Sequence, residues 1–69
     1  MDYKDRFKIE YAELKERHDK LKKIMIKYEA ETLEFKPSCP PHLLGRQLEI
    51  MREYLHVLEV RAEIEGIEL

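Results

Sequence analysis

Mostly apolar residues recur along the first half of the chain in alternating steps of four and three residues. These first-seam positions are Phe7, Tyr11, Leu14, His18, Leu21, Met25, Tyr28, Thr32 and Phe35. An average spacing of 3.5 residues lines up side chains on a helix that packs lengthwise against other helices. The pattern therefore predicts a long helix over residues 2–35. The simplest role for His18 on this seam is a packed polar residue that fixes register, and a pH switch or ligand contact is the alternative.

A proline-rich turn over residues 36–40 separates this helix from a second one. Pro37, Pro40 and Pro41 each lack an amide hydrogen and restrict the preceding residue, so the first helix must end before them. Pro41 suits the first position of a helix, which we predict over residues 41–65. Its seam holds Leu44, Leu48, Met51, Leu55, Leu58 and Ala62. A short connector makes two helices antiparallel neighbours, so we expect an all-α antiparallel helical hairpin.

The second helix carries more apolar surface than one partner helix can cover. A second stripe, about 100° around the helix from the seam, holds Ile50, Tyr54, Val57 and Ile64. Scattered exposed apolar residues are common, which is the simpler interpretation. We favour an interface between copies of the chain, which gives a helical-bundle homo-oligomer. The short tail, residues 66–69, is also partly apolar and could dock on a neighbouring copy.

The length and composition indicate that the chain needs partner chains for its stability. One domain of residues 1–69 has a small core, and a single cysteine excludes an internal disulfide. Charged residues form 41% of the chain and the net charge is −2, which argues against a dedicated nucleic-acid binder. There is neither a signal peptide nor an apolar run near 18 residues. We therefore expect a cytoplasmic protein that does not enter membranes.

Motifs that carry catalysis are absent from the sequence. There is no glycine-rich phosphate loop, nucleophile elbow, HExxH motif or clustered zinc ligands, so we expect no enzyme activity, no metal and no cofactor. Cys39 and His42 are three residues apart, which allows a thiolate–imidazole pair in principle. A lone cysteine between prolines is more often a small packing residue.

The start of the second helix is free of acidic residues. His42 and Arg46 lie four residues apart, and the first acidic residue is Glu49. Free amides, the positive end of the helix dipole and two basic side chains favour a phosphate or carboxylate. The alternative is that Ser38 caps the helix and that Arg46 pairs with Glu49 or Glu34.

Tyrosines near basic residues are further candidates for ligand binding. Tyr11 or Tyr54 can stack on a nucleotide base, and Arg17 or Arg61 can serve as charge partners. The simpler interpretation places these tyrosines in the core with a hydrated hydroxyl. The basic face formed by Lys20, Lys23 and Lys27 is most simply a solvated face.

Two segments resemble a family of short helical-hairpin proteins from crAss-like and other gut phages. They are Tyr3-x-x-Arg6-x-x-x-Glu10-Tyr11-x-Glu13-Leu14-Lys15-Glu16-Arg17 and Gln47-x-x-x-Met51-x-x-Tyr54-Leu55-x-x-Leu58-Glu59-x-Arg61, joined by the proline-bearing turn. More weakly, the chain is similar to phage sponge proteins, which oligomerise and sequester nucleotide signals of bacterial immunity.

The resemblance to sponges implies a non-enzymatic anti-defence protein in the infected bacterium. Its ligand would be a cyclic oligonucleotide or an ADP-ribose derivative, held by basic and aromatic side chains between subunits. The alternative function is a structural or interaction hairpin that binds a host or phage protein through its second stripe.

Overall fold

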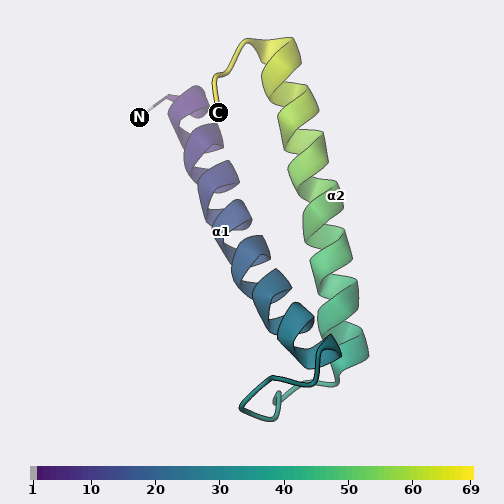
Figure 1. The fold of residues 1–69 in the computed structure, drawn as a ribbon. Helices are drawn as coiled ribbons and strands as arrows, with labels where there is room; N and C mark the ends of the chain where they lie inside the picture. Colours follow the sequence, from purple (N-terminus) through teal and green to yellow (C-terminus); the bar gives the residue numbers. More distant parts are fainter. Residues whose placement is uncertain (1) are drawn as a thin grey trace.

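A computed structural model describes residues 2–69 as two long helices, α1 over Tyr3–Glu29 and α2 over Pro41–Glu65. The helices lie side by side and run in opposite directions, with the connecting loop at one end and both termini near the other (Figure 1). The prediction of an all-α antiparallel hairpin is confirmed. Met1, which the predicted single domain includes, lies outside the described residues. Within residues 2–69, neither helix combines the length and apolar character that crossing a membrane requires.

The first helix begins where the sequence places it. The Asp2 carboxylate accepts a hydrogen bond from the Asp5 amide at 2.9 Å, and this N-cap satisfies one of the free amides of the first turn. Asp5 itself adds a negative charge near the positive end of the helix dipole. Local chemistry thus sets this boundary.

The predicted end of the first helix at residue 35 is wrong, because α1 ends at Glu29. The Glu31 amide donates to the Tyr28 carbonyl and the Thr32 amide to the Lys27 carbonyl, at 3.1 and 2.9 Å. This Schellman motif requires a left-handed residue, and Glu31 adopts φ 61°. The seam therefore stops at Tyr28, and Phe35 is 56% exposed in the loop.

Replacing Glu31 with glycine should raise the free energy of unfolding by about 1 kcal/mol, because glycine takes the left-handed conformation without steric cost. Gly66 offers the matched opposite change. Its φ is 71°, and an added Cβ would meet no atom within 4 Å, so alanine there should cost about 1 kcal/mol through the backbone alone. Urea denaturation of both variants measures the two effects. A lower stability of Glu31→Gly would contradict this account of the α1 end.

The buried core lies in the half of the hairpin that holds the termini. Its members are Phe7 and Leu14 of α1, Leu55, Leu58 and Ala62 of α2, and Ile67 of the tail. Tyr11 and Met51 pack against this cluster, whereas seam residues nearer the loop, such as Met25 and Leu44, are only half-buried. The hairpin itself thus covers Ile67, which the sequence left free to dock on another copy.

Candidate functional site

The predicted ligand residues fall into different parts of the hairpin. One groove, of about 680 Å³, lies near the loop, and we call it the turn groove. It is lined by Lys22, Met25, Ile26, Glu29, His42, Gly45, Arg46, Leu48 and Glu49. A second groove, of about 630 Å³, lies along α1 and ends at the C-terminal tail, and we call it the tail groove. It is lined by Lys8, Tyr11, Ala12, Lys15, Glu16, Asp19, Lys20, Lys23, Glu68 and Leu69.

The turn groove unites His42 and Arg46, as their spacing predicts, and adds Lys22 from α1. No side chain caps α2, and within residues 2–69 Arg46 forms no ion pair, so Ser38 and the acidic partners do not play the alternative roles. The free amides are fewer than expected, however. Pro41 has none, and the Leu43 and Leu44 amides donate to the Pro40 carbonyl at 3.0 and 3.3 Å.

The charges that line the turn groove balance, because Lys22 and Arg46 are matched by two carboxylates while His42 is neutral at pH 7. Glu29 and Glu49 line the groove together with its three basic side chains. Opposite charges at such short range reduce the attraction for an added anion. An anion site at His42 and Arg46 stays a prediction.

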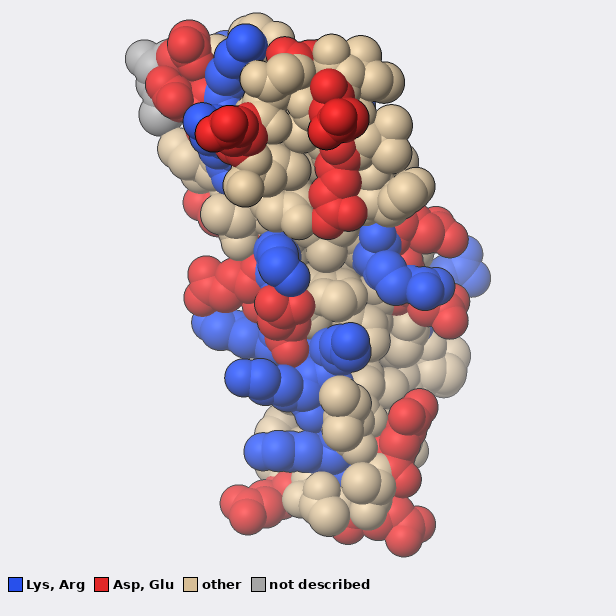
Figure 2. Space-filling model, turned by 45° about the horizontal axis from the view of Figure 1, so that its top comes forward, with Lys and Arg blue, Asp and Glu red and all other residues tan. Residues whose placement is uncertain are grey.

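The tail groove combines lysines with an apolar floor. Lys and Arg side chains gather over the middle of α1 (Figure 2), and four lysines line the groove itself: Lys8, Lys15, Lys20 and Lys23. Lys15 pairs with Asp19 at 3.5 Å and Lys20 with Glu16 at 2.9 Å, both as exposed pairs that hold these lysines only weakly. Sequence reasoning assigned Lys20 and Lys23 to a solvated face, because the tail that completes the groove comes from the far end of the chain.

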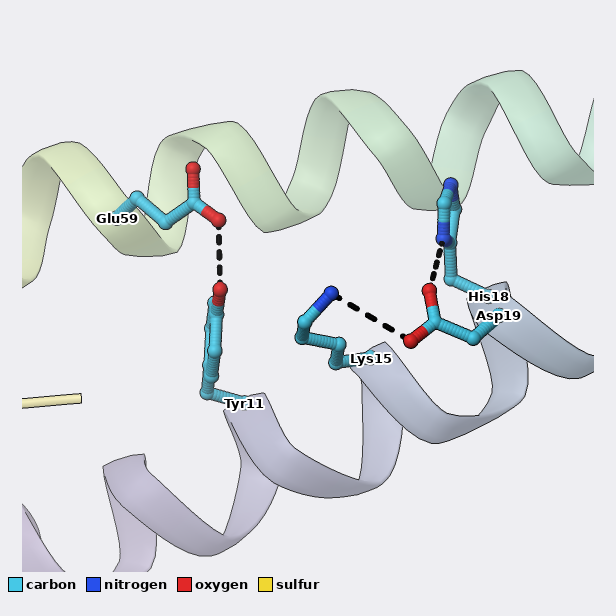
Figure 3. A network of polar contacts seen from close by, with 5 residues as sticks. All are labelled: Tyr11, Lys15, His18, Asp19 and Glu59. Carbon is cyan, nitrogen blue, oxygen red and sulfur yellow. Dashed lines mark hydrogen bonds and ion pairs between the residues drawn. The ribbon is translucent and has the colours of Figure 1, made fainter.

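Tyr11 lies in this groove and reaches across to α2 (Figure 3). Its hydroxyl donates a hydrogen bond of 2.6 Å to Glu59 Oε2. That hydrogen bond, followed by desolvation and the charge of Glu59, raises the pKa of Tyr11 to about 12. This hydrogen bond orients the aromatic ring of Tyr11, so a contact between the two helices positions the ring in the groove.

His18 lies on the same side of α1, one turn beyond Lys15 (Figure 3). Its Nδ1 is 3.1 Å from Asp19 Oδ1, and the hydrogen bond lowers the pKa of Asp19. The His18 side chain is only 12% exposed. This contact links the seam histidine to the Asp19–Lys15 pair at the groove.

Tyrosine–glutamate pairs connect the helices at further points. The Tyr54 hydroxyl donates to Glu10, and this hydrogen bond raises the pKa of Tyr54. Burial and the Glu65 carboxylate raise the pKa of Tyr3. These pairs could not be predicted from the sequence, because only the antiparallel register of the helices places each tyrosine opposite a glutamate. Tyr54 lines neither groove.

The stability of the hairpin should depend on the Tyr11–Glu59 pair at high pH. The pKa of Tyr11 is raised from 10.0 to about 12, so the folded state keeps its proton where the unfolded state loses it. The stabilisation is complete below pH 10 and disappears as the pH rises to about 12. The urea midpoint should fall across this window, and it should fall less for Tyr11→Phe. An equal loss in both proteins would assign the decline to other groups, such as the lysines.

The two arginines that were predicted as charge partners, Arg17 and Arg61, lie outside both grooves. Arg17 approaches Glu13 at 3.8 Å on an exposed face of α1. Arg61 bonds Glu65 at 2.9 Å, and its guanidinium lies over the Phe7 ring at 4.9 Å from the centroid. Arg61 thus covers the core, and neither arginine is placed to contact a ligand in the tail groove or the turn groove.

The second stripe of α2 is exposed along its length. Its members Ile50, Tyr54, Val57 and Ile64 are 54%, 43%, 52% and 78% exposed.

Cys39 is a half-buried free thiol in the loop. Across residues 2–69, no three histidine, cysteine or acidic side chains are grouped to hold a metal ion.

These features define a small all-α hairpin protein with open grooves that are lined by both basic and acidic side chains. A family model described as Sequestin matches residues 1–64, and the chain belongs to the Sequestin family. The family name suggests sequestration, which implies binding rather than catalysis. No curated protein and no solved structure matches the chain.

Proposed function

We propose that this protein is a non-enzymatic phage anti-defence protein that sequesters a phosphorylated nucleotide signal in the cytoplasm of the infected bacterium. The ligand class is a cyclic oligonucleotide or an ADP-ribose derivative. Membership of the Sequestin family supports sequestration. The nucleotide as ligand is inferred from the tail groove, which Tyr11 and four lysines line together with Glu16, Asp19 and Glu68.

The chemistry of the tail groove suits the two parts of a nucleotide. Tyr11, which is half-buried, and Ala12 provide apolar surface, and a base that stacks on the aromatic ring contributes about 1–3 kcal/mol. The ammonium groups of Lys8 and Lys15 attract the phosphates without needing a fixed geometry. Since sequestration requires only tight binding, the absence of a catalytic motif from the sequence fits this role.

The exposed stripe of α2 supports assembly into a homo-oligomer. The hairpin buries few side chains, and a single core of this size supplies only about 3–5 kcal/mol. Packing Ile50, Val57 and Ile64 against another copy would bury apolar surface that the single chain leaves in water. Assembly would also bring the grooves of several chains together.

Thermal shift measurements with a panel of cyclic dinucleotides, cyclic trinucleotides and cyclic ADP-ribose compounds test the proposal. At least one member should raise the melting temperature, and adenosine, which has no phosphate, should have little effect. Arg46→Glu in the turn groove and Lys15→Glu in the tail groove show which groove responds. No shift with any nucleotide would overturn the proposed ligand class.

The exposure of the same stripe favours one alternative, an interaction hairpin that binds a host or phage protein. Val57→Asp should then abolish binding of the partner protein, and Lys15→Glu should leave that binding unchanged. Pull-downs with both variants separate the two functions. A partner that is lost only with Val57→Asp, without any nucleotide bound, supports the interaction hairpin.

A further inference from the structure

The C-terminal tail turns back from α2 toward α1 (Figure 1). Gly66 adopts a left-handed conformation, and the Ile67 amide donates to the Ala62 carbonyl at 2.8 Å. Ile67 is only 6% exposed and belongs to the buried core. This anchor fixes the tail at the end of the tail groove, where Glu68 and Leu69 line it together with α1.

The family match covers residues 1–64 and leaves this tail outside. The helix that supplies the lysines and Tyr11, α1, thus lies within the family's common part, whereas Glu68 and Leu69 do not. We propose that Leu69 and Glu68 determine which ligands the tail groove accepts, Leu69 through the base and Glu68 through the phosphate charge. This inference rests on the proposed nucleotide-binding function.

Leu69 adds apolar surface to the groove. It is 53% exposed, so a base in the groove would cover a side chain that is otherwise partly in water. Covering apolar area stabilises a complex in proportion to the area removed from water. Leu69 should therefore favour ligands that carry a base and have no effect on bare phosphate groups.

Glu68 acts in the opposite direction. Within residues 2–69 its carboxylate forms no ion pair, although it lines a groove with Lys8 and Lys15. A negative charge near the phosphate subsite repels each added anionic charge, and water and salt weaken the repulsion without removing it. Glu68 should thus lower the affinity for the most highly charged ligands.

Calorimetric titration with ADP and with pyrophosphate separates the two contributions. Leu69→Ala should weaken the affinity for ADP about fivefold, because an apolar contact is lost, and leave the affinity for pyrophosphate unchanged. Glu68→Gln should raise the affinity for both probes about threefold, because the repulsion between Glu68 and their phosphates is removed. The matched controls are Leu43→Ala and Glu53→Gln, exposed residues of α2 that line neither groove.

The outcomes distinguish this inference from the proposed function. If the wild-type protein binds ADP and neither tail variant changes the affinity, only the role of the tail is overturned. If the wild-type protein binds a member of the nucleotide panel but neither ADP nor pyrophosphate, the role of the tail is overturned and the proposed function stands. An amide spectrum adds a check that needs no ligand: Leu69→Ala should shift the resonances of Ala12 and Lys15 and leave Arg46 unchanged. Unshifted Ala12 and Lys15 resonances would overturn the placement of the tail.

Discussion

Reversing the charges of Lys8 and Lys15 together should weaken nucleotide binding by at least about 100-fold, since each reversal replaces an attraction for phosphate by a repulsion. Both side chains line the tail groove, and Lys15 holds only an exposed ion pair with Asp19. The fold should therefore survive the double substitution, which circular dichroism can verify. Calorimetry with the nucleotide that most stabilises the wild-type protein measures the loss.

A charge-matched control separates a local site from a general effect of net charge. Lys36→Glu with Arg52→Glu makes the same change in net charge at residues that line neither groove. This control should reduce the affinity only severalfold, because salt screens charges beyond about 8–10 Å. Equal losses in the two double variants would contradict a site in the tail groove.

Replacing Leu58 with alanine should unfold most of the isolated chain at 25 °C. Leu58 is 1% exposed and lies in the buried cluster between the helices. Removing such a leucine costs about 2–5 kcal/mol, which matches the roughly 3–5 kcal/mol that the core of a chain of this size supplies. The helical signal in circular dichroism and its urea dependence measure the effect.

Leu43→Ala provides the control for this prediction. Leu43 lies in the first turn of α2 and is 47% exposed, so its truncation removes little buried surface and should cost less than about 1 kcal/mol. A stable Leu58→Ala protein at low concentration would contradict the packing of the hairpin described above. Stability that returns only at high concentration would instead show that assembly compensates for the lost core contact.

The sequence predicts the hairpin well because local chemistry marks most of its boundaries. Asp2 caps α1, Pro41 starts α2, and the two seams specify helices that pack lengthwise. The end of α1 is the exception. Its Schellman motif places Glu31 at a position where a glycine usually marks the end of a helix. The sequence therefore does not indicate that α1 ends there.

The site was predictable only where its residues share one helix. His42 and Arg46, like Tyr11 and Lys15, are four residues apart and therefore lie together on their helices. Glu59 and Leu69 come from the other end of the chain, and their positions follow from the antiparallel register and from the turn at Gly66. Periodicity specifies which face packs but not which residues end up opposite one another.

The most direct test of sequestration is a native mass spectrum of the wild-type protein after mixing with the nucleotide panel. We expect an assembly of more than one chain that carries at least one phosphorylated nucleotide, and loss of that added mass in the Lys8→Glu, Lys15→Glu variant. A wild-type spectrum without any added nucleotide mass would contradict it.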